Sequence, residues 1–236
     1  MQKDNQNTRN LLPLTNFDGS LATKVYLVLR TAILSLAYHP GEIIRKREIC
    51  EKLGVSRSPV SEAIAILASE GLVKVVPKAG TYVSLFSMDE IKEGAFLREA
   101  LELAAVEYLV DKITDNQLAQ LYQNLNEQEA MISGGDFAAF YIKDSEMHEL
   151  IMSFTGFKRL KTLAESSWVQ VNRARQLNLP SPGRIQETVA EHREIIDAIK
   201  AGNHQQARTA TRSHLRQLIK YLEPLEIERP ELFEPS

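Results

Sequence analysis

Apolar residues in the first part of the chain recur every three or four positions in three segments, which predicts helices at 21–36, 46–53 and 57–70. Gly54 follows the second segment and Gly71 follows the third, and glycine commonly ends a helix. Only the three residues GVS separate the second helix from the third. This spacing predicts a helix-turn-helix.

Two short segments rich in Val, Thr and Tyr come next, at 72–76 and 81–85. The turn sequence PKAG separates them, and this combination is typical of a β-hairpin. We therefore expect residues 20–85 to form a winged helix-turn-helix in which the hairpin is the wing. The preceding residues, 1–19, are polar without periodicity and predict a flexible arm.

Beyond Ser87 the helical period continues without a strand signal, and six further helices are predicted, at 88–111, 115–133, 136–154, 157–178, 184–201 and 204–222. Short connections containing Gly or Pro separate them, as in a compact antiparallel bundle. The expected fold is therefore mainly α, with an all-helical domain at 86–224 and an acidic tail at 225–236. A chain of 236 residues is long enough for two domains.

Composition favours a cytoplasmic protein. Hydrophobic residues make up 44% of the chain and charged residues 25%, which is ordinary for a globular protein. No segment approaches the roughly 18 uninterrupted apolar residues of a membrane span, so no membrane partner is expected. The N-terminal sequence MQKDNQNTRN lacks the apolar core of a secretory signal, and Cys50 alone cannot form an intrachain disulfide.

The net charge of -3 is unevenly distributed. Residues 20–84 carry nine Lys/Arg against five Asp/Glu, a net of +4, whereas residues 85–236 carry 17 against 24, a net of -7. A basic small domain joined to an acidic larger one suits a module that faces phosphates attached to one that does not.

The second helix of a helix-turn-helix enters the major groove by its N-terminus, so its first residues should be small, polar or basic. Here they are Ser56, Arg57 and Ser58, of which Ser56 can cap the helix and Arg57 can reach a base or a phosphate. Further candidate contacts open the preceding helix or lie in the wing turn: Arg45, Arg47, Lys78 and Gly80. The alternative is a helix-turn-helix that binds no DNA, with these basic residues forming a solvated face.

Residues 25–84, which include PGE, LGVSRSPV, EGLV and KAGTYVS, resemble the DNA-binding domain of the GntR family of bacterial regulators. The resemblance implies DNA contacts from Arg47, Arg57 and the wing around Gly80. Many members have an arginine four residues after the position of Arg57, where this chain has Ser61. Residues four apart share a helix face, so Ser61 points where that arginine would point. Its side chain offers only a short hydroxyl group instead of a guanidinium. We expect a different operator preference.

Three histidines of the helical half each lie on the apolar stripe of their helix. His148 follows Asp144 by four residues, a spacing that lets both side chains reach one ion, and His192 and His214 lie on two later helices. Burying a carboxylate and three imidazoles is costly unless they are paired or coordinated, so a divalent metal is an economical partner. The set suits Zn²⁺ first, then Ni²⁺ or Mn²⁺, better than Mg²⁺ or Ca²⁺. The alternative for each histidine is a hydrogen-bonded core residue.

The helical half also resembles the effector-binding FCD domain of the FadR subfamily, through FLREALELAAVEYL (96–109), DSEMHELIMSFTGFKRL (144–160), EHREIIDAI (191–199) and ARTATRSHL (207–215). In metal-binding members the ligands are an Asp, a His four later and two further His, a pattern matched by Asp144, His148, His192 and His214. Arg98 lies where such members have an arginine near the pocket, with an ion pair to Glu102 as the alternative. Arg173 and Arg175 are further candidates for holding an anionic effector.

Together these features predict a homodimeric, sequence-specific transcriptional regulator, usually a repressor in this family, that binds an imperfect palindrome of double-stranded DNA. A small carboxylate effector beside the metal would change its affinity for the operator. One alternative is a metalloenzyme whose metal activates water, which the lack of a spare general base on the inward stripes disfavours. Another is an architectural DNA-binding protein with a purely structural metal and no effector.

Overall fold

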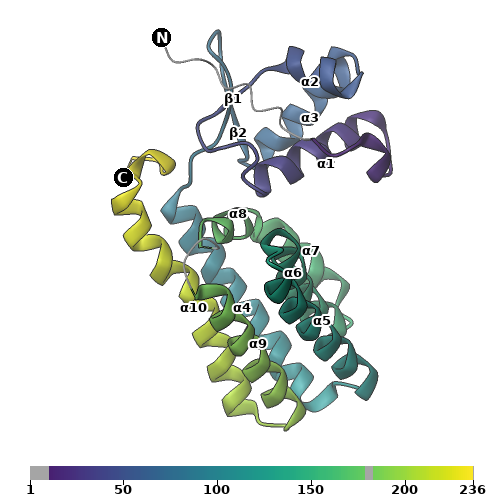
Figure 1. Ribbon diagram of the computed structural model, residues 1–236, viewed down its shortest axis with the longest axis vertical. Coiled ribbons are helices and arrows are strands. Elements are labelled where there is room, and N and C mark those ends of the chain that lie inside the picture. Colours follow the sequence, from purple (N-terminus) through teal and green to yellow (C-terminus); the bar gives the residue numbers. More distant parts are fainter. Residues whose placement is uncertain (1–10, 179–182, 236) are drawn as a thin grey trace. The chain divides into compact units, whose positions relative to one another are not determined.

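The computed structural model describes residues 11–178 and 183–235, which divide into two compact units (Figure 1). The first unit runs to Phe86 and includes the later segment Leu232–Glu234, whereas the second covers Ser87–Glu231. Helices and a small sheet make up the first unit, and helices alone make up the described part of the second. The predicted fold class, mainly α, is confirmed.

The first unit is a winged helix-turn-helix. It contains α1 (Leu21–Leu34), α2 (Lys46–Leu53), α3 (Arg57–Ser69), and an antiparallel sheet of order β1-β3-β2 formed by β1 (Ile43–Ile44), β2 (Val73–Val76) and β3 (Gly80–Val83). The apolar faces of α1 and α3 pack on each other and form its core, which includes Val25, Leu29, Ile33, Val60, Ile64 and Leu67. Because the apolar face of α3 packs into this core, the polar face of α3 is turned toward solvent.

The sheet has one strand more than the predicted hairpin. β1 pairs with β3, so that Ile43 lies opposite Tyr82 and Ile44 lies opposite Thr81. Two residues are too few to show the alternation that marks a strand in a sequence. Because β1 directly precedes α2, this pairing ties the start of the helix-turn-helix to the wing.

Gly54 makes the tight turn between α2 and α3 possible. Its φ of 65° lies in the left-handed region, which glycine enters without a Cβ clash. The amide of Val55 donates to the carbonyl of Cys50 at 3.1 Å and closes the end of α2. Ser56 occupies the N-cap position of α3, but its hydroxyl makes none of the capping hydrogen bonds that the sequence predicts.

The segments predicted as an arm and a tail both contain structure. Within the described part of the arm, Leu14–Asn16 form a 3-10 helix, η1, against α1, while residues 1–10 lie outside the described residues. In the tail, Pro230–Leu232 form a second 3-10 helix, η2. Beyond it, the amide of Phe86 donates to the carbonyl of Leu232 at 2.9 Å, and the amide of Glu234 donates to the carbonyl of Phe86 at 2.8 Å. Polarity alone did not reveal this short pairing.

The second unit is a bundle of long helices: α4 (Met88–Lys112), α5 (Asp115–Gly134), α6 (Phe137–Phe154), α7 (Lys158–Ser167), α8 (Val169–Asn178), α9 (Arg184–Lys200) and α10 (His204–Glu228). α4 packs against α10 and α6, α5 against α6 and α9, and α9 against α10 (Figure 1). Among the described residues, none of these helices is long and apolar enough to cross a membrane. Because these helices pack on one another, polar side chains on their inner faces meet in the interior of the bundle.

The segment predicted as one helix at 157–178 is two helices, α7 and α8, which meet at Trp168. The Trp168 side chain is buried, and the guanidinium of Arg98 lies 5.3 Å from its ring centre. A break at this residue turns the large ring into the bundle, and hydrophobic period alone does not show a break of one residue. α10 also continues past Pro224 to Glu228, beyond its predicted end.

Candidate metal centre and DNA-reading surface

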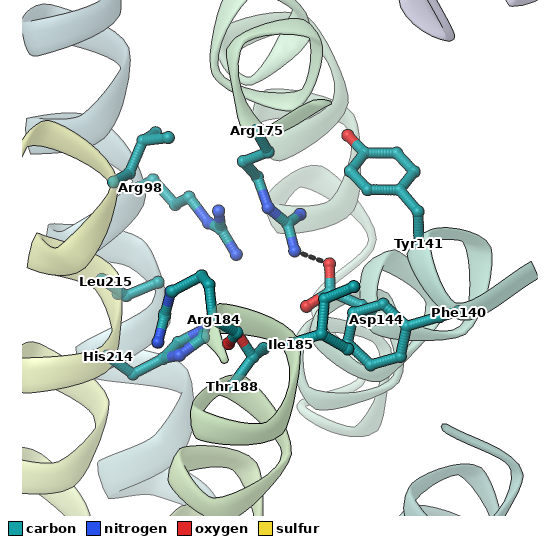
Figure 2. A pocket seen from close by; sticks show the side chains of 11 residues that line it. Arg98, Phe140, Tyr141, Asp144, Arg175, Arg184, Ile185, Thr188, His214 and Leu215 are labelled. Carbon is teal, nitrogen blue, oxygen red and sulfur yellow. Dashed lines mark hydrogen bonds and ion pairs between the residues drawn. The ribbon is translucent and has the colours of Figure 1, made fainter. Parts of the chain in front are cut away.

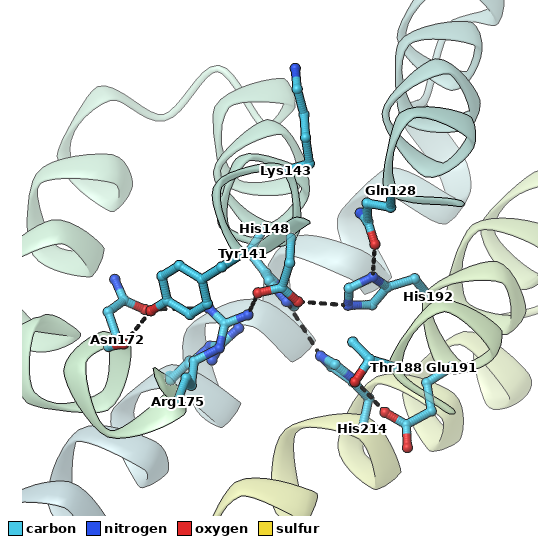
Figure 3. A network of polar contacts seen from close by, with 12 residues as sticks. Gln128, Tyr141, Lys143, His148, Asn172, Arg175, Thr188, Glu191, His192 and His214 are labelled. Carbon is cyan, nitrogen blue, oxygen red and sulfur yellow. Dashed lines mark hydrogen bonds and ion pairs between the residues drawn. The ribbon is translucent and has the colours of Figure 1, made fainter. Parts of the chain in front are cut away.

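Three helices bring His148 of α6, His192 of α9 and His214 of α10 to one point in the bundle (Figure 3). Their exposed fractions are 2%, 0% and 7%. One nitrogen from each ring lies within 4.8 Å of the others, and the Nε2 atoms of His148 and His214 are 3.3 Å apart. The structure thus gathers the three histidines predicted from separate apolar stripes.

A different side chain holds each of the three rings from behind. Nδ1 contacts the Glu102 carboxylate at 2.7 Å in His148, the Gln128 amide oxygen at 2.8 Å in His192, and the Glu191 carboxylate at 2.7 Å in His214. Because these partners are acceptors, the proton of each neutral ring lies on Nδ1, and Nε2 keeps a lone pair. The three Nε2 lone pairs then face one another with no hydrogen to share between them. A divalent metal ion can accept all three as ligand atoms.

Burial keeps the three imidazoles neutral. Desolvation lowers the pKa of His148, and it lowers the pKa of His192 and His214 well below the usual value, with the positive charges of Arg98 and Arg175 adding to the effect at the latter two rings. A neutral imidazole is the form that binds a metal ion. At neutral pH, therefore, a metal ion does not have to displace protons from these rings.

Glu102 on α4 is fully buried between Arg98 and His148. Burial alone would raise the pKa of this carboxyl group, but the positive charge of Arg98 and the hydrogen bonds from Arg98 and His148 hold the pKa of Glu102 well below its usual range. The Arg98 Nε atom donates to the carboxylate at 2.6 Å, so the ion pair expected as the alternative for Arg98 is present. A charged Glu102 is a strong acceptor for the ring of His148.

Sequence patterns did not identify the residues behind the histidines. Glu102 lies 46 positions from His148, and Gln128 lies 64 positions from His192, so no local spacing relates them. One signal was available in α4. Arg98 and Glu102 are charged residues one turn apart on a helix face that is otherwise apolar, and charged residues are rarely buried without a function or a partner.

Asp144, the fourth predicted ligand, lies at the edge of the histidine cluster. Its side chain is buried, and its Oδ1 lies 3.4 Å from Nε2 of His192. Its Oδ2 forms an ion pair with the guanidinium of Arg175 on α8. Nε2 of His192 makes no hydrogen bond to any of the described residues. A buried nitrogen without a hydrogen bond, next to a buried carboxylate, fits the donor set of a cation site.

A cavity of about 60 Å³ adjoins the histidines (Figure 2). Its lining includes three arginines, Arg98, Arg175 and Arg184. The other predicted effector residue, Arg173, is fully buried but does not line this cavity, and burial lowers the pKa of Arg173 to about 10. Arg184 was not predicted, because it is the first residue of α9 and precedes the periodic part of that helix. The lining therefore has as many arginines as the sequence predicts, but Arg184 stands in place of Arg173.

The N-terminal part of α3 is exposed and carries Arg57, Ser58 and Ser61 toward solvent. Ser58 donates to the Glu62 carboxylate at 3.2 Å. Lys46 of α2 donates to the Ser61 hydroxyl at 3.4 Å. A positive charge from the neighbouring helix thus lies beside the serine that replaces the family's arginine, a contribution that the sequence reading missed.

The remaining predicted DNA contacts lie at the start of α2 and in the wing turn. Arg45 and Arg47 are exposed near the start of α2, and each pairs with an acidic residue of that helix, at 3.4 Å and 2.7 Å. Exposed pairs of this kind are weak, so the arginines remain able to bind phosphate. In the wing turn, Lys78 and Gly80 have positive φ values of 63° and 143°. This turn presents an exposed lysine at its tip.

Two protein-family models match the chain. The model for bacterial regulatory proteins of the gntR family matches residues 21–83, and the FCD domain model matches residues 93–217. A relative described as an uncharacterized HTH-type transcriptional regulator in an unstable DNA locus of Streptomyces ambofaciens is 35% identical over 209 residues, covering 89% of this chain and 88% of its own. The HTH-type transcriptional repressor RspR of Escherichia coli is 27% identical over 210 residues, with coverages of 89% and 92%.

Solved structures with the same fold include McbR/YncC of Escherichia coli, with a TM-score of 0.76 and 23% identity over 88% of this chain and 99% of that one. A transcriptional regulator GntR from a Rhodococcus species has a TM-score of 0.75 and 24% identity, covering 87% and 99%. At these identities the similarity concerns the fold.

Proposed function

The chain belongs to the GntR family of bacterial regulatory proteins and carries an FCD domain, and on this basis we propose that it is a repressor controlled by a small effector. It is an HTH-type transcriptional regulator, and its relatives are regulators rather than enzymes. In the proposal, a homodimer binds an imperfect palindrome of operator DNA. A carboxylate effector bound beside a divalent metal, zinc in the first instance, then changes the affinity for that DNA.

The single observation that carries the metal part is the convergence of three Nε2 lone pairs, each fixed by an acceptor on Nδ1. His148, His192 and His214 would hold the ion, and Asp144 would be the fourth ligand. The bound ion would supply a positive charge to which a carboxylate can coordinate. The chain itself supplies three arginines in the adjoining cavity, which favour an anion over a neutral molecule.

The DNA part is supported by the exposed N-terminus of α3. Its side chains and the adjacent Lys46 give the first unit a compact group of donors that can reach base edges and phosphates. In the proposal, Arg57 reads a base or a phosphate, and Lys46 supplies the charge that Ser61 lacks. Two copies of α3, related by a two-fold axis, would match the two half-sites of a palindrome.

Fluorescence anisotropy tests DNA binding, with labelled DNA from the promoter region of the protein's own gene. Specific binding should weaken steeply as salt is raised, because each phosphate contact releases counterions. Arg57→Ala should weaken binding by roughly 5- to 150-fold, the range for losing one base or phosphate contact. Lys112→Ala, at the exposed end of α4 in the other unit, is the control and should bind normally. Equal binding to unrelated DNA of the same length would contradict the proposal.

Elemental analysis tests the metal part, on protein purified without a histidine tag. About one ion per chain is expected from a single closed ligand set. The double variant His148→Ala/His214→Ala should lose the ion, whereas His204→Ala, which removes an exposed histidine outside the cluster, should keep it. Equal metal content in the double variant and in the unaltered protein would rule out these ligands.

A further inference from the structure

The exposed face of α3 carries shorter and less charged side chains along its length. Arg57, Ser61 and Ala65 follow one another at intervals of four residues, so they share one face, and all three are exposed. Arg57 is long and charged, whereas Ser61 offers one hydroxyl and Ala65 one methyl group. A hydroxyl both donates and accepts, so a serine alone distinguishes the bases poorly. The middle of this face therefore lacks a long side chain of its own that specifies a base.

Lys46 of the neighbouring helix α2 reaches the middle of this face. α2 packs against α3 (Figure 1), and the Lys46 ammonium donates to the Ser61 hydroxyl at 3.4 Å. The Lys46 side chain is half-buried, so it is less free to turn away than a fully exposed lysine. A long cationic group thus lies beside the short Ser61 side chain.

The charge of Lys46 has no acidic partner within the described part of the chain. The arginines on either side of it pair with acidic residues of α2, whereas Lys46 donates to a neutral hydroxyl. Glu62, the acidic residue next to Ser61, accepts instead from Ser58 at 3.2 Å. A neutral acceptor orients an ammonium group without cancelling its charge. The ammonium group of Lys46 therefore stays available to a ligand.

The position of Lys46 is unfavourable for α2 itself. Lys46 is the first residue of the helix, where the positive end of the helix dipole disfavours a cation. A residue that breaks a local rule of stability without a compensating partner is expected where the chain has a function. Its place therefore favours binding over a role in holding α2 together.

In a helix-turn-helix the first helix crosses the DNA backbone, so the ordinary partner of a lysine on α2 is a phosphate. Lys46 differs because its ammonium lies against the exposed face of α3. We propose that Lys46 is a specificity-determining residue that reads a guanine at the base pair faced by Ser61. Lysine binds the O6 and N7 acceptors of guanine, and the short Ser61 side chain leaves room for the ammonium to reach them. This inference rests on the proposed DNA binding and adds a base contact from α2.

Selection from a randomised double-stranded DNA library by the full chain, followed by sequencing, tests the inference. Among the positions that the unaltered protein specifies, Lys46→Ala should relax one in each half-site, and that position should hold guanine. Anisotropy with two operators that differ only at this base pair should show the preference reduced roughly 5- to 150-fold, the range for one base contact. Lys52→Ala, which removes an exposed lysine near the other end of α2, is the control and should leave every position unchanged. Urea denaturation should show no loss of stability in Lys46→Ala.

Two variants of Ser61 separate a base contact of Lys46 from one of Ser61. Ser61→Ala leaves Lys46 in place and should retain most of the preference for guanine. Ser61→Arg puts a guanidinium into the space of the Lys46 ammonium, and arginine also binds guanine. Adding Lys46→Ala to Ser61→Arg should therefore have little effect at this base pair, because the effects of two residues that share one contact do not add.

The inference is wrong if Lys46→Ala weakens binding to all sequences equally, because Lys46 then binds a phosphate. It is also wrong if the relaxed position holds a base other than guanine, or if Ser61→Ala abolishes the preference while Lys46→Ala retains it. If the unaltered protein selects a sequence and Lys46→Ala selects the same one at every position, this inference fails while the proposed function stands. If the unaltered protein selects no sequence, both fail.

Discussion

His192 is held by an uncharged partner, whereas the other two histidines of the cluster contact carboxylates. The Gln128 amide oxygen accepts from Nδ1 of His192, and the Gln128 amide nitrogen donates to Asn124 at 2.7 Å, which fixes the orientation of the amide. Gln128 is fully buried on α5, so water cannot replace it. Its contribution to metal binding can therefore be tested without changing the charge of the site.

Replacing Gln128 by leucine should weaken metal binding by about 10- to 100-fold, because the ring of His192 loses the contact that orients it and its Nδ1 proton loses its acceptor. Competition with a chromophoric chelator measures the dissociation constant. Gln123→Leu changes an exposed residue of the same helix and should leave the constant unchanged. If the two variants bind metal equally well, the Nδ1 contact is not what positions the ring.

At the scale of residues, the sequence predicts which histidines face inward, but it does not predict the side chains that contact them. A histidine on an apolar stripe is visible from helical period, and His148, His192 and His214 were found in this way. The acceptors behind them belong to helices that pack only in the folded bundle, and so does the meeting of Asp144 with Arg175 on α8. Such long-range pairs leave no trace in the spacing of a single sequence.

Helix boundaries were predicted best where glycine or a capping residue marks them. The end of α2 at Gly54 and the start of α5, where Thr114 and Gln117 form a capping box, follow local rules. β1 was missed because it consists of two residues whose strand character comes from pairing with β3. The break between α7 and α8 depends on where Trp168 packs, which the hydrophobic period does not encode.

The turn of the helix-turn-helix gives a prediction at the scale of elements. Gly54 has a φ of 65°, and an added Cβ would meet nothing within 4 Å, so any cost of Gly54→Ala is conformational. We expect a loss of about 1–2 kcal/mol in the free energy of unfolding, measured by urea denaturation. Gly134→Ala is the control: this glycine also has free space but lies at the end of α5 without a positive φ. Alanine there should be neutral or stabilise the protein by about 0.5–1 kcal/mol.

On the scale of the whole molecule, the chain passes between its two units twice. It leaves the winged helix-turn-helix after Phe86, forms the helical unit, and returns to the first unit at Leu232. The returning segment follows α10, the helix that carries His214. Composition predicts only an acidic tail here, because Phe233, the one buried side chain among its described residues, carries no pattern. The connection still offers a direct covalent path from the histidine cluster to the winged helix-turn-helix.

The variant Phe233→Ala tests this path. Phe233 is 3% exposed, and its ring centre lies 5.8 Å from that of the fully buried Phe86. Truncating it should destabilise the first unit by about 3 kcal/mol, near the lower end for a buried phenylalanine, as measured by urea denaturation. Phe137→Ala, which removes a half-exposed ring of α6, is the control.

The same variant should also change regulation, because α10 would no longer end in a segment anchored beside Phe86. We expect the ratio of operator dissociation constants, measured with and without zinc plus malonate as a test carboxylate, to move toward unity in Phe233→Ala at a temperature where the protein is folded. A coupling between sites requires an element whose state both sites bias, and this prediction assigns that part to the anchored end of α10. If the variant is folded and the ratio is unchanged, the signal reaches the DNA-binding unit through the connection at Phe86 and Ser87 instead.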